Sequence, residues 1–209
     1  MPAQRLTLAV PITAMALALT GGIVRAVAVD AAQTAPVPQA AAGFSRTIPE
    51  KSLVERGAYL VRTMGCNDCH TPLKMGPRGP EPDMTRALTG HPSDMPMPAP
   101  PPLPADGPWI AYMAATNTAF SGPWGTSFAA NLTPDPETGL GKWTFEQFYQ
   151  TMKTGRHQGK GRALLPPMPY FIVGAAHDQE IRAIFTYLQS LKPVRNKVPV
   201  PVDPPGAGK

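Results

Sequence analysis

Two cysteines, three positions apart, constrain the fold of this chain more than any other feature of its sequence. They stand in the run Cys66-Asn67-Asp68-Cys69-His70, and the chain has no other cysteine. Two thiols at this spacing reach the two vinyl groups on one edge of a porphyrin, and the imidazole of His70 is then carried under the ring, where it can ligate iron. The motif therefore predicts one covalently attached haem c, around which the rest of the chain must fold.

Other common uses of a cysteine pair agree less well with the sequence. A disulfide framework needs more cysteines than these two. A zinc site needs two further ligands at metal spacing. A thioredoxin-like redox motif follows a strand in a βαβ pattern, whereas this motif follows a helical stripe made of Leu53, Gly57, Leu60, Val61 and Met64. Haem attachment is therefore the favoured interpretation.

The second axial ligand must come from nine methionines other than Met1, or from His91, His157 and His177. We expect Met168, because Pro166, Pro167 and Pro169 bracket it and a rigid loop holds a thioether at iron with little loss of chain entropy. Ordinary core packing is the alternative role for Met168. The competing ligands are Met75, Met84, Met95 and Met97, and we expect His91 and His157 to face solvent.

The N-terminal segment has the pattern of an export signal. Arg5 precedes a 19-residue apolar run from Leu6 to Val24, and Ala26-Val27-Ala28 follows. This pattern predicts a cleaved signal peptide over residues 1–28. An uncleaved anchor is the alternative, because about 20 apolar residues span a bilayer. Both readings place the remaining chain in the periplasm, either free or anchored in the inner membrane.

The remaining chain predicts helices separated by proline-rich connections. Residues 29–47 are rich in Ala, Pro and Gln and predict a linker, and residues 48–193 predict one domain. Within it we expect a helix over 145–154, started by a capping box at Thr144 and Gln147, and a helix over 178–191 ended by Pro193. The chain has 28 prolines, so 71–108 predicts a long irregular loop and 194–209 an extended tail.

The order of these features resembles class I cytochromes c. A helix with Gly57 and Leu60 leads into the cysteine motif, and a Pro-Met-Pro loop precedes a final helix with Tyr187-Leu188. More narrowly, the segments Asn131–Thr144 and Leu165–Tyr170 resemble the cytochrome c subunits of bacterial membrane-bound alcohol and sugar-acid dehydrogenases. The resemblance covers about residues 51–193.

The resemblance implies an all-α class I fold, in which the first and last helices cross beside one haem and the Gly57 face meets the Tyr187 face. It also implies that the segment Asn131–Trp143 lines the haem edge near the propionates. Asn131, Trp143 and Tyr170, with Phe171, are candidates for packing on the haem, and plain core packing is the alternative for the aromatic ones. The long proline-rich insertion of residues 71–130 has no role that the resemblance transfers.

These features favour an electron-transfer protein over an enzyme. With His70 and Met168 both bound to iron, no axial position is open for oxygen or peroxide. We expect a periplasmic monohaem cytochrome that passes single electrons from a donor, such as a dehydrogenase, to a respiratory acceptor, such as a terminal oxidase or another cytochrome. The alternative is a tightly bound subunit of a membrane-associated dehydrogenase.

Charge gives a weaker indication of partners. The formal net charge of +5 lacks the basic stripe of a nucleic-acid-binding protein. Four basic residues nevertheless cluster before the Met168 loop, where they would either steer an acidic redox partner or form solvated loop charge. They are Lys153, Arg156, Lys160 and Arg162.

Overall fold

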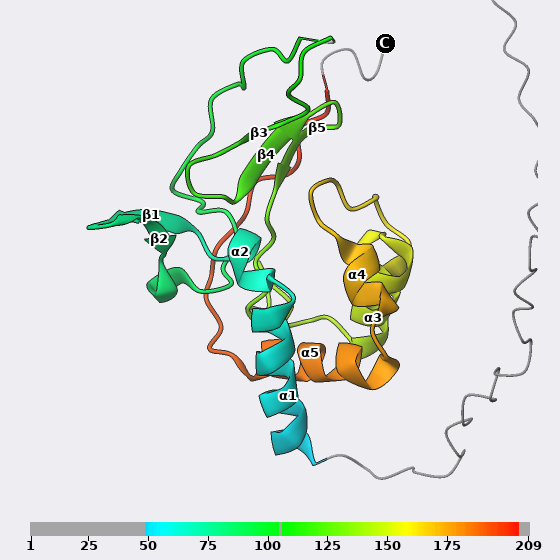
Figure 1. Ribbon diagram of the computed structural model, residues 1–209. Helices are drawn as coiled ribbons and strands as arrows, with labels where there is room; N and C mark the ends of the chain where they lie inside the picture. Colours follow the sequence, from blue (N-terminus) through cyan, green and yellow to red (C-terminus); the bar gives the residue numbers. More distant parts are fainter. Residues whose placement is uncertain (1–48, 105, 205–209) are drawn as a thin grey trace, which may run out of the picture. The chain divides into compact units, whose positions relative to one another are not determined.

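The computed structural model describes residues 49–104 and 106–204 (Figure 1). The predicted signal or anchor segment 1–28 and the linker 29–47 lie outside these residues. Within the described ranges, no helix has the length and apolar character needed to cross a bilayer.

The described residues form five α-helices, and each begins or ends where the sequence gives a local signal. They are α1 (Glu50–Thr63), α2 (Cys66–His70), α3 (Phe145–Thr154), α4 (Tyr170–Ala175) and α5 (Asp178–Ser190). The capping box before α3 is confirmed, since Thr144 Oγ1 accepts from the Gln147 N–H and Gln147 Oε1 accepts from the Thr144 N–H. Gly155 then ends α3 in the left-handed conformation that glycine permits.

Helices α1 and α5 cross in close contact (Figure 1). The crossing is close because Gly57 has no side chain: a Cβ there would collide with the backbone carbonyl of Ala183 and stand 2.6 Å from Tyr187 Cβ. The expected meeting of Gly57 and Tyr187 is thus observed. The buried core beside this crossing is apolar and includes Leu60, Val61, Phe148, Met152, Val173, Ile181, Ile184 and Leu188.

The prediction of an all-α fold is wrong. The described residues also form two antiparallel sheets, so the chain combines helices with sheets. The first sheet pairs β1 (Leu73–Gly76) with β2 (Gly79–Pro82), and the second has the order β3 (Tyr112–Met113), β4 (Ala119–Gly122), β5 (Gly125–Phe128). All five strands lie in the 71–130 insertion, much of which we predicted to be irregular.

The first sheet was not predicted because its second strand contains two prolines. Proline is excluded from central strands because it cannot donate to the ladder. In a two-stranded ribbon, however, both strands are edges, and β2 accommodates Pro80 and Pro82 opposite Met75 and Leu73. The strands of both sheets are also no longer than four residues, too short to show a clear alternation of apolar and polar side chains.

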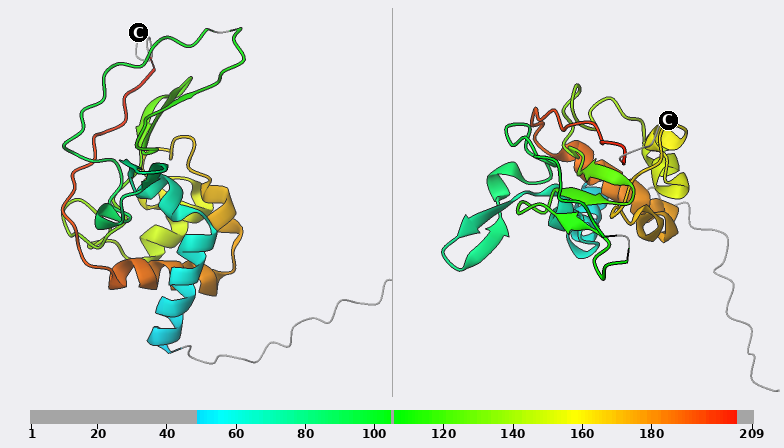
Figure 2. Two further views of the ribbon diagram at one scale, coloured as in Figure 1. Left: turned by 60° about the vertical axis from the view of Figure 1, so that its left-hand side comes forward. Right: turned by 90° about the horizontal axis from the view of Figure 1, so that it is seen from above.

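The C-terminal tail packs along the insertion instead of leaving the domain. Thr126 of β5 and Val202 exchange two backbone hydrogen bonds, of 2.7 and 2.9 Å. Figure 2 shows the tail running beside the segments that lead into the second sheet. Asn196, near the start of the tail, is buried.

Candidate functional site

The cysteine motif forms the short helix α2 directly after α1. Gly65, with φ of 73°, makes the bend between the two helices. Cys66 and Cys69 lie one turn apart on α2, and both carry free thiols that are partly exposed. Burial raises the pKa of the Cys66 thiol to about 11, and burial followed by the charge of Asp68 raises the pKa of Cys69. Such protonated thiols are unlike the thiolates of redox-active cysteine pairs.

The His70 side chain is buried and oriented by a backbone carbonyl. Its Nδ1 lies 2.7 Å from the Ala130 carbonyl oxygen, so Nδ1 carries the proton and donates it. The Ala130 carbonyl therefore fixes both the orientation and the tautomer of the ring. In the resulting tautomer Nε2 holds a lone pair, and it has no hydrogen-bond partner among the described residues. Burial lowers the pKa of His70, which favours the neutral form that a metal requires.

The proposed second ligand lies on a loop that the insertion supports. Met168 is half-buried and packs against the core. Ser127 of β5 donates a hydrogen bond of 2.6 Å to the Pro166 carbonyl, two residues before Met168. The competing methionines of the insertion, Met75, Met84, Met95 and Met97, are all exposed. Met168 is thus the one of these five methionines that is not exposed, and its binding to iron stays a prediction.

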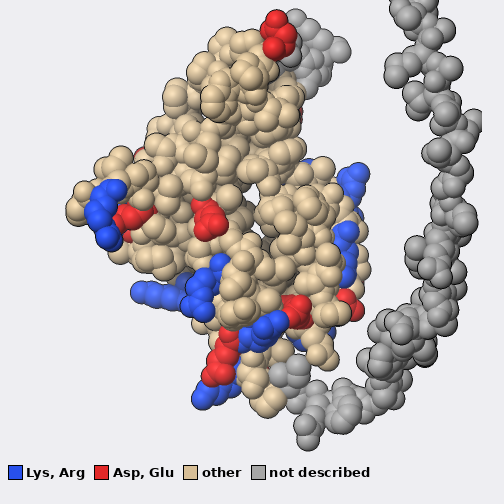
Figure 3. All heavy atoms as spheres, in the orientation of Figure 1, with Lys and Arg blue, Asp and Glu red and all other residues tan. Residues whose placement is uncertain are grey.

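An opening separates the cysteine helix α2 from the loop that carries Met168. Figure 3 shows it between the surface over α2 and the surface over α3 and α4, and Figure 1 places α2 on one side of it and the loop before α4 on the other. Two adjacent thiols, one free imidazole nitrogen and a half-buried thioether are the donor set of a His/Met haem c. The residues present therefore fit such a group.

The three residues predicted to pack on the haem each have protein contacts. Asn131 is buried, and its Nδ2 donates to Thr138 Oγ1 and to the Val194 carbonyl, at 3.2 and 2.8 Å. Trp143 packs edge-on against His157, with ring centroids 4.9 Å apart. The Tyr170 ring lies over Gly155. Contact of these three residues with a haem stays a prediction.

Several residues that support the site could not be predicted from the sequence. Ala130 supplies the acceptor for His70, and Ser127 holds the Met168 loop. Gly90, in the left-handed region with φ of 77°, packs against the Ala130 carbonyl. Neither an alanine acting through its backbone nor a serine in a short strand has a recognisable sequence signal. The expectation that His91 faces solvent is wrong, since its ring is buried and hydrogen-bonded to Thr118 and to the Met95 carbonyl.

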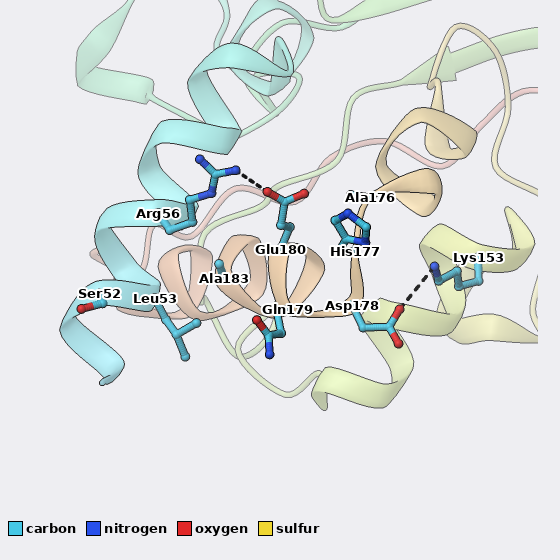
Figure 4. Close-up of a pocket in the computed structure, with 10 residues that line it drawn as sticks. All are labelled: Ser52, Leu53, Arg56, Lys153, Ala176, His177, Asp178, Gln179, Glu180 and Ala183. Carbon is cyan, nitrogen blue, oxygen red and sulfur yellow. Dashed lines mark hydrogen bonds and ion pairs between the residues drawn. The ribbon is translucent and has the colours of Figure 1, made fainter. Parts of the chain in front are cut away.

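A separate cleft of about 730 Å³ lies where α1 meets the start of α5 (Figure 4). Its charged side chains are paired: Arg56 with Glu180, and Lys153 with Asp178 at 3.5 Å. Neither the cysteines nor the two proposed iron ligands line it. This cleft is therefore not the candidate haem site.

Comparison with known proteins gives no match to a family model. The alcohol dehydrogenase (quinone) cytochrome c subunit of Gluconobacter oxydans is 29% identical over 72% of this chain and 24% of its own length. The gluconate 2-dehydrogenase cytochrome c subunit of Pantoea cypripedii is 26% identical over 65% of this chain and 22% of its own length. The fructose dehydrogenase cytochrome subunit of Gluconobacter japonicus is 32% identical over 36% of this chain and 16% of its own length.

The chain spans less than a quarter of the length of these relatives. The names of all three designate cytochrome subunits, which agrees with an electron-transfer protein. The resemblance predicted from the sequence is thus confirmed: this chain is similar to the cytochrome c subunits of bacterial alcohol and gluconate dehydrogenases.

Proposed function

We propose that this chain is a periplasmic c-type cytochrome that carries one covalent haem and passes single electrons from a dehydrogenase to a respiratory acceptor. The orientation of His70 carries the proposal. Its Nδ1 is committed to the Ala130 carbonyl, which leaves Nε2 as the ligand atom at the end of the cysteine helix. When bound there, haem c supplies one-electron redox chemistry.

Each site residue has one task in this proposal. Cys66 and Cys69 would hold the porphyrin through thioether bonds, and His70 and Met168 would supply the two protein ligands of its iron. A thioether ligand raises the reduction potential relative to a second imidazole. With both ligands supplied by the protein, the residues of this chain would bind and orient a one-electron redox centre.

Basic residues near the Met168 loop support an acidic redox partner. Arg156, Lys160 and Arg162 are exposed, whereas Lys153 is paired with Asp178. Figure 3 shows Lys and Arg side chains along the edge of the surface over α3 and α4. Charges in this position steer a transient partner and lose effect as salt rises. The partner on the acceptor side would be a terminal oxidase or another cytochrome.

The surface around the second sheet favours a second candidate, the tightly bound subunit of a membrane-associated dehydrogenase. Residues 87–141, which include this sheet, contain no Lys or Arg, and Figure 3 shows the corresponding surface almost free of charge. Trp109 and Ile110 are 72% and 74% exposed on this surface, and Met113 is exposed beside them. Exposed apolar groups that gather on an uncharged surface mark interaction sites. Stable co-purification with a catalytic chain, lost in Trp109→Ser, would favour this candidate over the free carrier.

Mass spectrometry of the exported protein tests the main proposal. The polypeptide should carry the mass of one haem, and acid–acetone extraction should leave that mass in place. The Cys66→Ala variant should lose covalent attachment through one thioether. Haem that washes out of the wild-type protein, or two haems per chain, would contradict the proposal.

A further inference from the structure

We propose that Asn196, in the C-terminal tail, is a positioning residue for the iron ligand His70 and thereby sets the reduction potential of the centre. The inference rests on the proposed function for the assignment of His70 as a ligand. The Asn196 side chain is buried and fully engaged: Nδ2 donates to the Thr89 and His91 carbonyls at 2.7 and 2.8 Å, and Oδ1 accepts from the Ser93 N–H at 2.9 Å.

Asn196 is hydrogen-bonded to residues 89–91, and this same segment contacts His70. Gly90, between the two carbonyls that Asn196 binds, donates its N–H to the His70 carbonyl at 2.8 Å. Gly90 also packs so closely on Ala130 that a Cβ would stand 2.6 Å from the Ala130 carbonyl oxygen. That oxygen is the acceptor for His70 Nδ1. Residues 89–91 are therefore held between the tail on one side and the His70 acceptor on the other.

A second connection joins the tail to the same carbonyl from the other side. Asn131, the residue after Ala130, donates from Nδ2 to the Val194 carbonyl at 2.8 Å. The backbone N–H of Asn196 in turn donates to Thr138 Oγ1 at 3.0 Å, and Thr138 Oγ1 also accepts from Asn131 Nδ2. The Ala130 peptide is thus restrained in two ways: Gly90 packs against it, and Asn131, the next residue in the chain, is bonded to the tail.

This restraint has an electronic consequence at His70. A hydrogen bond from Nδ1 to a carbonyl raises the basicity of the imidazole toward its metal. A more basic ligand stabilises ferric over ferrous iron and lowers the reduction potential. If the tail is loosened, the Ala130 carbonyl moves, the hydrogen bond weakens, and the potential rises.

The experiment compares Asn196→Ala with Lys197→Ala in the haem-loaded protein. Lys197 is the next residue of the tail and its side chain is exposed, so its removal is a matched control. Redox titration should show a higher midpoint potential in Asn196→Ala and no change in Lys197→Ala. In the reduced protein, the His70 ring N–H should exchange with solvent about fivefold faster in Asn196→Ala, the factor expected when one hydrogen bond of ordinary net strength is lost.

A conservative variant keeps the test decisive if Asn196→Ala does not fold. Asn196→Leu keeps about the size of the side chain and removes both amide donors without adding charge, so it should shift the potential in the same direction. A folded variant of either kind with unchanged potential and unchanged exchange, and only a lower free energy of unfolding, would overturn the inference. A wild-type protein without haem would instead overturn the proposed function.

Discussion

Replacing Gly57 with alanine tests the packing on which the helical part of the domain depends. The new methyl group would point from α1 into α5, where it would meet the Ala183 carbonyl and Tyr187 Cβ. A backbone carbonyl cannot rotate away from a methyl group as a flexible side chain can. The two helices would therefore have to separate along their crossing.

The net cost follows from two opposing contributions. Overpacking costs about 1–3 kcal/mol, and a backbone collision belongs at the upper end of that range. Alanine recovers about 1 kcal/mol because its helix propensity exceeds that of glycine. We therefore expect the free energy of unfolding to fall by about 2 kcal/mol, which lowers the Tm by about 4–8 °C for a domain of this size.

Thermal and urea unfolding monitored by circular dichroism measure the effect. Glu55→Ala is the matched control, because Glu55 lies on the same helix with its side chain exposed. Alanine there gains only a few tenths of a kcal/mol of helix propensity and meets no collision. Glu55→Ala should leave the stability within about 0.5 kcal/mol of wild type. A Gly57→Ala protein as stable as Glu55→Ala would refute the close crossing of α1 and α5.

Three further predictions follow from single contacts. Thr144→Ala removes the cap of α3 and should cost about 1 kcal/mol in urea unfolding, whereas Thr144→Ser should restore most of it. The hydrogen bond from Arg56 holds the pKa of Glu180 below its ordinary value of 4.5. This pair therefore stabilises the fold above that pH, and its contribution is lost as pH falls through the lowered pKa. Glu180→Gln should remove this acid dependence of the stability, which is worth about 0.2–1 kcal/mol for an exposed pair. Ser127→Ala frees the Pro166 carbonyl, and carbon monoxide should then displace the second axial ligand more readily than in wild type; unchanged binding would contradict support of the loop by β5.

The elements that could be predicted from the sequence depend on residues close together in the chain. The cysteine motif, the capping box at Thr144 and the final helix all rest on spacings of a few residues. The predicted range 145–154 matches α3, and the predicted 178–191 differs from α5 by one residue. Local spacing determines these elements because their hydrogen bonds close within one or two turns.

The features that sequence analysis missed depend on contacts between distant residues. The hydrogen bond from His70 to Ala130 joins residues 60 positions apart, and the bond from Asn196 to Thr89 joins residues 107 apart. The acceptors are backbone carbonyls, which every residue carries. Short strands with proline at their edges likewise form only because a partner strand or the tail is available. Neither kind of contact leaves a pattern in the residues that make it.

The central claim is that His70 and Met168 hold the iron of one covalent haem. A thioether bound to ferric haem c gives a weak charge-transfer band in the far red, so the far-red absorption spectrum of the oxidised protein tests the claim most directly. The band should be present in wild type and in the control Met95→Ala, and absent in Met168→Ala, with the haem still covalently attached. A band that survives in Met168→Ala and disappears in Met95→Ala would contradict the account, because the insertion would then supply the ligand.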